Sequence, residues 1–393
     1  MSNKVVRVTR QNWGQRVSNS FGGLVFGLIL IPAAMIGLWM GEGMRDLSKI
    51  AATAVQVDAN QALTAKDGDF VSATGTLSSN AQIGDAPYMA DGDYVSLNRV
   101  VEMYAWTQKS DSTTTEDTVG GGSTTTTTYT YSKQWVENPA DSTTFEEPAG
   151  HENPTKVIES TTITADYATV GNYEVNPQSV QLPGGDKIGQ NPVELPEGYA
   201  VKGEYIFSSD AAATTPLVGD LRISYTALPT GKTVTVFGSQ QGNSVVSATV
   251  DGAEFFRMFI GTHTEALATM HTEYVVLIWI IRILGTFGIF MGLQLIVQPL
   301  ARILGVIGIL GNAVEGITGF FNALIALVLG STIIIVSQIA HNIYLLIATL
   351  LLVGGGIYLY MRKRNGTGTV AASASPAATN SDTGVDTSPP KMG

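Results

Sequence analysis

Residues 277–297 (LIWIIRILGTFGIFMGLQLIV) form an apolar run that contains one charged residue, Arg282. A helix of this length rises about 1.5 Å per residue and is about 30 Å long, which matches the hydrocarbon thickness of a bilayer. An apolar stretch of 18 or more residues is typical of a transmembrane helix. The run therefore predicts a membrane protein, with a long polar part before it and a shorter, mostly apolar part after it.

Further apolar segments predict three more spans. One of them covers residues 21–40, and residues 320–360 are almost continuously apolar over 41 residues. A single helix of that length would measure about 60 Å, twice a bilayer, so we expect a tight helical hairpin. Its turn is predicted at a polar cluster made of Ser337, Gln338, His341 and Asn342. The expected transmembrane helices are residues 21–40, 277–297, 317–338 and 342–361.

The charges beside these spans predict the topology. Residues 1–20 carry no acidic residue and four basic ones: Lys4, Arg7, Arg10 and Arg16. Positive charge next to a first span holds that end in the cytoplasm, which places residues 41–276 outside it. Residues 298–316, an amphipathic interfacial segment, and the disordered tail 362–393 would then lie inside. A cleaved signal peptide is the alternative for residues 21–40, but this core is longer than the usual ~7–15 residues.

The segment between the first two spans is strongly acidic. Residues 41–276 contain 30 Asp and Glu against 12 Lys and Arg, a balance of −18. Such a charge repels nucleic acid, so nucleic-acid partners are excluded. The chain has no cysteine, which excludes disulfides, thiolate metal sites and a cysteine nucleophile.

From Phe70 onward the sequence pattern predicts β-structure: short runs in which apolar and polar residues alternate are separated by recurring Asp-Gly turns. Residues 94–106 predict its longest strand. The Ser/Thr-rich residues 111–128 predict a mobile hairpin tip before a strand at 129–136. Residues 253–274 predict a helix that continues into the second span. The expected fold class is α+β: one N-terminal and three C-terminal transmembrane helices, with a large β-rich extracytoplasmic domain after the first.

Catalytic motifs are absent from the sequence, which contains no GxSxG elbow, HExxH, phosphate-binding loop or dinucleotide fingerprint. His263 and His271 lie eight residues apart, about 12 Å along a helix, too far to share one zinc ion. We therefore predict no enzyme, no metal and no cofactor. The alternative is a lipid-modifying enzyme or transporter at the outer membrane interface that uses the carboxylates of the domain or these two histidines.

Arg282 is the residue with the strongest physical reason to be functional. Placing an arginine in hydrocarbon costs ~2.5–3.5 kcal/mol even on lenient scales. Two interpretations remain open: the side chain reaches up to the lipid headgroups, or it has a partner within the membrane. Glu42 and Arg45, at the outer edge of the first span, are the candidates to meet it there.

Three glycines in the second span form one small-residue face. Gly285, Gly288 and Gly292 follow the i, i+3, i+7 pattern of one helix side. Small residues let another helix approach closely in a membrane. This face predicts a helix contact, either within the chain or with a second copy.

Several segments, taken in order, resemble the LUMA family, also called the transmembrane protein 43 family, over essentially the whole chain. The second span with its Arg282 is one of them; the others are GEGMR (41–45), RVVEMYAW (99–106), YSKQW (131–135), GHENP (150–154), VGDLRISY (218–225) and FMGLQ (290–294). None of these is a catalytic signature. The chain departs from the family pattern by an inserted Met44 and by its Ser/Thr-rich hairpin tip and tail.

The resemblance implies a non-enzymatic membrane-organising scaffold. Eukaryotic members lie in the endoplasmic reticulum and inner nuclear membrane with the large domain in the lumen, self-associate and contribute to nuclear-envelope organisation. For this chain it implies membrane lipids, further copies of the chain and other membrane proteins as partners. The low lysine content, acidic domain and absence of cysteine favour a bacterial member in the cytoplasmic membrane.

Overall fold

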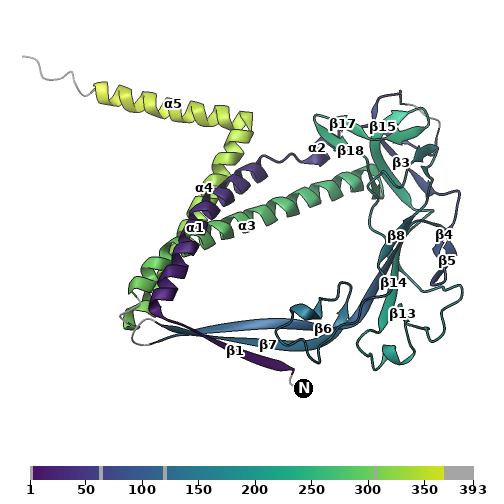
Figure 1. Ribbon diagram of the computed structural model, residues 1–393. Coiled ribbons are helices and arrows are strands. Elements are labelled where there is room, and N and C mark those ends of the chain that lie inside the picture. The colour runs from purple at the N-terminus through teal and green to yellow at the C-terminus, as the bar shows by residue number, and fades with distance from the viewer. Residues whose placement is uncertain (1–2, 62–64, 118–121, 305–307, 367–393) are drawn as a thin grey trace, which may run out of the picture. The chain divides into compact units, whose positions relative to one another are not determined.

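The computed structural model (Figure 1) describes residues 3–61, 65–117, 122–304 and 308–366, with the backbone alone for residues 300–304, 308–317 and 363–366. The chain forms two compact units, Met1–Ile334 and Ile335–Gly393. The helices among the described residues are α1 (Trp13–Glu42), α2 (Leu47–Ala51), α3 (His263–Leu304), α4 (Gly308–His341) and α5 (Ile343–Gly366). Short 3₁₀ turns occur at Ser142–Thr144 and Ala211–Ala213.

Within the described residues, four helical segments are long and apolar enough to cross a membrane: Trp13–Ala51, His263–Pro299, Thr318–His341 and Ile343–Arg362. They confirm the predicted four-span fold, although α1 begins eight residues before the predicted span. It begins at Trp13 because Asn12 and Gln15 form a capping box. The Asn12 side chain accepts a hydrogen bond from the Gln15 amide at 2.8 Å, and the Gln15 side chain accepts one from the Asn12 amide at 3.2 Å.

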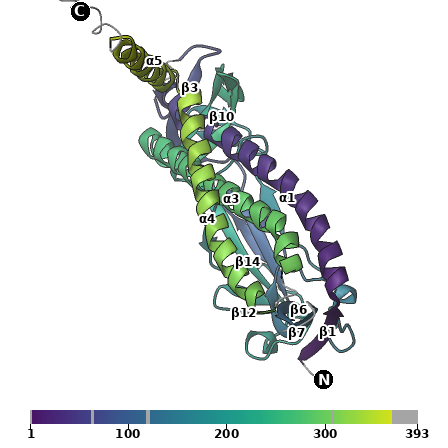
Figure 2. The same ribbon diagram turned by 90° about the vertical axis from the view of Figure 1, so that its left-hand side faces the viewer.

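In the first unit, α1 and α3 run antiparallel, and the first part of α4 lies beside them (Figure 2). Leu38 of α1, Ile289 of α3 and Ala326 of α4 form the buried centre of this contact. The outward faces of the helices expose large apolar side chains, including Phe26, Ile29 and Phe287. Side chains of this kind suit a lipid environment rather than water.

The larger sheet has the strand order β1-β7-β6-β14-β13-β12, with β11 beside β14 and β8 beside β6. Its strands are β1 (Lys4–Gln11), β6 (Tyr94–Glu116), β7 (Ser123–Val136), β8 (Thr161–Thr164), β11 (Asp186–Ile188), β12 (Ala200–Lys202), β13 (Tyr205–Phe207) and β14 (Leu221–Pro229). All of its described pairings are antiparallel. Alternate residues of β6, among them Leu97, Val101 and Met103, fill the core against β14.

The Ser/Thr-rich tract is not a mobile tip where the structure describes it. β6 continues to Glu116 and β7 starts at Ser123, and the two strands pair without interruption from Met103↔Val136 to Glu116↔Ser123. Cross-strand hydroxyl bonds support the pairing, for example Thr114 to Thr125 at 2.9 Å. Threonine is β-branched and favours strands, a preference that outweighs the polarity of the tract. Residues 118–121 lie outside the described part of the chain.

The N-terminal segment joins this hairpin, which the sequence did not predict. β1 pairs with β7 over eight residues, from Lys4↔Thr130 to Gln11↔Ser123 (Figure 1). Residues 4–11 are therefore an edge strand of the domain rather than a separate basic segment. We call β1, β7 and the part of β6 after Trp106 the three-stranded ribbon.

The second sheet has the order β19-β15-β16-β10-β9-β3-β2, with β15 also paired to β3. Its strands are β2 (Val55–Asp58), β3 (Phe70–Ser78), β9 (Ala168–Val170), β10 (Tyr173–Val175), β15 (Thr233–Gln241), β16 (Ser244–Val246) and β19 (Arg257–Ile260). Two-stranded sheets complete the domain: β4 (Ile83–Asp85) with β5 (Met89–Gly92), and β17 (Ala248–Val250) with β18 (Ala253–Phe255). Val71, Tyr173 and Val236 lie in the core of the second sheet.

Residues 253–274 do not form the continuous helix that was expected. Strands β18 and β19 occupy 253–260, and α3 begins only at His263. Gly261, with φ +97°, makes the turn. Thr262 and Glu265 then cap the helix, because the Glu265 carboxylate accepts the Thr262 amide at 2.7 Å.

Other predicted segments are described only in part. In the second unit the helix breaks at Asn342, whose side chain accepts hydrogen bonds from the amides of Tyr344 and Leu345 at 3.1 and 3.2 Å. The break lies at the position predicted for the turn, and the hairpin itself, with antiparallel packing of the last two spans, stays a prediction. Most side chains of the amphipathic segment 298–316, and the tail from residue 367, lie outside the described residues.

Candidate functional site at the membrane boundary

Arg282 has a partner within the chain. Its Nε and Nη2 donate to the two carboxylate oxygens of Glu42 at 2.6 and 2.9 Å, and its guanidinium lies over the Trp279 ring. The Glu42 side chain is only 5% exposed and that of Arg282 is 22% exposed. A bidentate pair of this kind is the geometry in which an arginine and a carboxylate tolerate burial. The structure thus brings together two of the three predicted boundary residues.

Arg45 does not take part in that pair. Its guanidinium donates to the backbone carbonyl of Asp251, in the turn between β17 and β18. Arg45 therefore connects the loop after α1 to the domain, whereas Glu42 connects α1 to α3. The sequence could not separate these roles, because Asp251 lies more than 200 residues away in the chain.

The glycine face of α3 packs against α1 of the same chain. A Cβ added at Gly285 would lie 2.5 Å from Leu38, and one at Gly292 would lie 2.5 Å from Ile31. At Gly288 the nearest atom is the Cβ of Ala34, at 3.0 Å. Of the two interpretations left open by the sequence, the contact within the chain is the one this structure contains.

Glycines on the α1 side make the contact reciprocal. A Cβ at Gly27 would meet the Gly292 carbonyl at 2.7 Å, and one at Gly41 would meet Ile281 at 2.5 Å. The sequence pattern of the second span did not point to Gly27 and Gly41, which lie in the first span. Their spacing in α1 was a usable signal, since small residues on both helices permit close approach.

Asp46, in the loop that follows α1, connects this loop to α3. Its side chain caps α2 through the Ser48 amide at 3.1 Å and lies 2.9 Å from Nδ1 of His271. Burial raises the pKa of this carboxyl, but the hydrogen bonds from Ser48 and His271 outweigh that and hold the pKa below its usual range. His271 thus has a structural role: it contacts the carboxylate that caps α2.

His263 has a different environment. Its Nδ1 lies 2.6 Å from the Ser72 hydroxyl, and the Ser72 residue is fully buried in the second sheet. The two histidines of the enzyme alternative therefore contact different partners and do not form one site.

The polar turn residues of the last hairpin lie in the second unit. The His341 ring contacts Ser337, with Nδ1 2.8 Å from its carbonyl oxygen, and Ser337 is fully buried. Asn342 caps α5 as described above, and Gln338 is exposed. Asn342 therefore lies at the break between the two helices and caps the second, while Ser337 and His341 contact each other at the end of the first.

Four of the segments that carried the family resemblance meet at the larger sheet: RVVEMYAW, YSKQW, GHENP and VGDLRISY. His151 of GHENP stacks on Tyr131 of YSKQW with ring centroids 3.9 Å apart and meets Trp106 edge-on. Its Nδ1 donates to the Glu147 carbonyl at 3.0 Å, and its buried Nε2 has no hydrogen-bond partner within the described residues. The Asn153 side chain accepts a hydrogen bond from the Trp106 amide and donates one to the Trp106 carbonyl.

Two partly buried ion pairs extend this cluster. Arg222 forms a bidentate pair with Glu102 at 2.6 and 3.0 Å and lies over the Trp135 ring. Arg99 pairs with Asp85 at 2.7 Å, and the Asp85 carboxylate also accepts the Tyr225 hydroxyl at 2.6 Å. Burial and this carboxylate raise the pKa of Tyr225 well above its ordinary value. These contacts stabilise the base of the ribbon.

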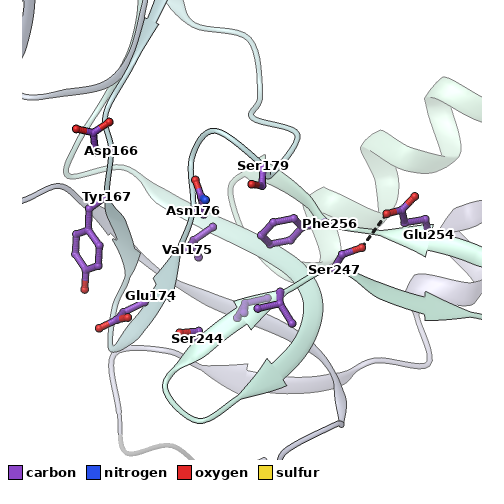
Figure 3. A pocket seen from close by; sticks show the side chains of 12 residues that line it. Asp166, Tyr167, Glu174, Val175, Asn176, Ser179, Ser244, Ser247, Glu254 and Phe256 are labelled. Atoms are coloured by element: carbon purple, nitrogen blue, oxygen red, sulfur yellow. Dashed lines mark hydrogen bonds between the residues drawn. The ribbon is translucent and has the colours of Figure 1, made fainter.

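A pocket of about 560 Å³ opens between β10, β16 and the β17–β18 hairpin (Figure 3). Its acidic side chains are Asp166, Glu174 and Glu254, and its lining contains no basic residue. Glu254 accepts the Ser247 hydroxyl at 3.0 Å, and Glu174 accepts the Asn243 amide at 2.9 Å. These donors are neutral and leave the negative charge of the carboxylates in place, so the pocket repels anions. Among the described residues, no group of three or more His, Asp or Glu could hold a metal ion.

Together the four spans and the domain after the first define a multi-pass integral membrane protein with a large β-rich domain. The family model described as Transmembrane protein 43 matches residues 103–343, more than half of the chain. The chain belongs to the transmembrane protein 43 family, as its sequence motifs predicted.

Known relatives agree with this assignment. The chain is 24% identical to Transmembrane protein 43 of Homo sapiens over 318 residues, which cover 76% of this chain and 79% of that protein. It is 27% identical to the Transmembrane protein 43 homolog of Drosophila melanogaster over 360 residues, which cover 86% and 94%. No solved structure matches the chain.

Proposed function

We propose that this chain is a non-enzymatic scaffold that organises membranes, self-associates through its helices and engages lipids or other membrane proteins. The observation that carries the proposal is that one folded domain contacts both ends of the first membrane helix. A domain held in this way keeps a fixed orientation to the helices and can present its surface reproducibly to neighbours in the membrane.

At the beginning of α1 the contact is made by the ribbon. β1 leads directly into the helix, and Arg16 pairs with Glu116 and donates to the Gly122 carbonyl near the end of the hairpin. Exposed pairs of Arg7 with Glu146 and of Arg10 with Asp117 add to it.

At the end of α1 the contact is made through α2 and α3. Glu42 pairs with Arg282, Asp46 contacts His271, and Ile50 of α2 packs in a cluster with Phe237 of the second sheet and Met270 of α3. Removing one partner of a buried ion pair costs more stability than breaking a surface pair, because the other charge stays buried without a partner.

Self-association would have to use surfaces other than the glycine face, because α1 occupies that face. Apolar side chains that point outward from the helices, such as Phe21, Val25 and Phe320, are exposed and available to a second copy. The enzyme or transporter alternative gains no support from its two histidines, which have separate structural partners.

The test is to extract the full chain from its membrane into lipid-containing polymer discs and to measure particle mass and co-purified molecules. We expect a defined multimer that carries a reproducible lipid class or protein partner. Monomers surrounded by unselected bulk lipid would contradict the proposal.

A further inference from the structure

A cavity of about 550 Å³ lies where the first and second spans meet the domain. Its walls come from the loop after α1, from α2, from α3 and from the β17–β18 turn. The apolar lining is contributed mainly by Met44, Leu47, Met270, Tyr274 and Leu277. This size is in the range of ordinary small-molecule sites.

The cavity lies at the depth expected for lipid headgroups. Met44 comes two residues after the end of α1, and Leu277 is the first residue of the predicted second span. Arg282, which is paired to Glu42, follows Leu277 by five residues, about 7.5 Å along the helix. A molecule in the cavity would therefore touch the polar boundary on one side and the start of the hydrocarbon on the other.

The polar lining carries both signs of charge: the basic residues are Arg45 and Arg257, and the acidic ones are Asp251 and Glu273. Arg257 donates from Nη2 to the Glu273 carboxylate at 2.9 and 3.1 Å. Its Nε is a buried donor that has no hydrogen-bond partner within the described residues. Arg257 is therefore held in the wall by its pair with Glu273, which fixes one positive charge beside the cavity.

We propose that this cavity binds one zwitterionic phospholipid, which deepens the lipid engagement of the proposed function and rests on it. The phosphate would accept hydrogen bonds from the guanidinium groups of Arg45 and Arg257. The ammonium of the headgroup would lie near the Asp251 carboxylate and the Tyr274 ring. The first methylenes of the acyl chains would pack on Met44 and Leu277, both of which are about two-fifths exposed.

The mixture of charges argues for a zwitterion. An anionic headgroup alone would face two carboxylates, and a cation alone would face two guanidinium groups. A headgroup with one phosphate and one ammonium pairs with both kinds. The acidic pocket of Figure 3 has no basic residue to bind a phosphate, so it serves as an internal control.

The experiment uses the full-length protein, delipidated in mild detergent and incubated with equimolar phosphatidylethanolamine and phosphatidylglycerol. Native mass spectrometry then counts the bound lipids. The wild type should retain phosphatidylethanolamine in preference to phosphatidylglycerol. Arg45→Gln should lower its retention about tenfold, the loss of roughly one charged hydrogen bond. Asp251→Asn should reduce the preference for phosphatidylethanolamine, because it removes the negative charge near the ammonium. The variant should fold, since Asn also tolerates the positive φ of this turn, +51°.

Asp166→Asn, an exposed carboxylate in the acidic pocket, is the matched control and should change neither value. Millimolar inorganic phosphate should not displace the lipid, because the apolar contacts are needed; displacement would identify free phosphate as the ligand and overturn the proposal. Equal retention of both lipids by the wild type, or unchanged retention by Arg45→Gln, would also overturn it. The same spectra report the mass of the complex. A multimer without lipid selectivity refutes this inference alone, whereas a monomer refutes the scaffold.

Discussion

The two ends of α1 are attached to the same domain by different physical means. At the Trp13 end, an edge strand, the pair of the buried Arg16 with Glu116 and two more exposed ion pairs connect the helix to the ribbon. At the Glu42 end, a buried bidentate ion pair and reciprocal glycine contacts connect it to α3. The first attachment depends on backbone pairing, the second on close packing. We therefore expect the Glu42 end to dominate stability and the Trp13 end to control where the ribbon lies.

The distance between the attachments has a consequence for topology. Arg16 and Glu42 are 26 residues apart in α1, about 39 Å along the axis and more than the ~30 Å of a hydrocarbon core. If α1 stands upright in the bilayer, the domain reaches both of its surfaces. The ribbon exposes hydroxyl and charged side chains, so it would need a water-filled route between them.

Cysteine labelling gives the largest expected effect, an all-or-none difference, because the native chain has no cysteine. Val6→Cys in β1 and Ser112→Cys in β6 should react with an impermeant maleimide from the same side of sealed vesicles, since the two strands belong to one ribbon. Labelling of these two cysteines from opposite sides of the membrane would contradict the pairing of β1 with the hairpin. Thr249→Cys, on the β17–β18 hairpin, should react from the other side if α1 crosses the bilayer upright; reaction of all three from one side would show that it does not.

Replacing Arg282 should have the largest effect on stability. Arg282→Met leaves the Glu42 carboxylate buried without a partner, which costs about 3–5 kcal/mol. The double variant with Glu42→Gln should recover most of that loss. Arg10→Met, which breaks an exposed pair at the other end, should change stability by less than about 1 kcal/mol. Thermal unfolding in detergent measures all three; an equal loss at both ends would refute the comparison.

The glycine contact predicts an intermediate effect. Gly27→Leu forces a side chain against the Gly292 carbonyl and should destabilise the helix pair by about 1–3 kcal/mol. Gly22 lies on the same helix with no neighbouring atom within 4 Å of an added Cβ, so Gly22→Leu is the matched control and should be neutral. A lower oligomer mass without loss of stability in Gly27→Leu would mean that this face serves a second copy instead.

A smaller and local effect is expected at the ribbon. Arg16→Gln removes the pair with Glu116 and should cost about 1–2 kcal/mol, felt at the ribbon rather than globally. Hydrogen exchange should speed up for amides in residues 4–11 and 123–130 and stay unchanged in the second sheet. Uniform acceleration across the domain would indicate that the ribbon and the sheets unfold as one unit.

The smallest effect concerns pH. The pKa of Asp46 is lowered in the folded state. Its contribution to the free energy of unfolding is therefore present above the unfolded pKa, about 4, and is lost as pH falls through the folded pKa. Asp46→Asn should therefore reduce the melting temperature near neutral pH and flatten its decline below about pH 4. Asp166→Asn should keep the wild-type profile. An unchanged acid limb in Asp46→Asn would show that His271 and Ser48 contribute little.

Much of the fold could be predicted because the relevant signals are local. A span is recognised from its own length and apolarity, and the helix break at Asn342 from one polar cluster. The Ser/Thr tract was misjudged because its low apolarity outweighed the β-propensity of threonine, and the signal that it would pair with β1 lies about 120 residues away. Residues 253–260 were misjudged because short strands next to a helix carry little pattern of their own.

The sequence by itself determined that this is a four-span protein with an acidic β-rich domain, since hydropathy, charge and alternation act over neighbouring residues. It also marked Arg282 as a residue that needs an explanation. Only the tertiary structure decided that Glu42 is its partner, that the glycines of α3 face α1, and that residues 4–11 complete a sheet. Each of these is a contact between segments more than 100 residues apart. Such contacts are set by how the whole core packs, which no single stretch of sequence encodes.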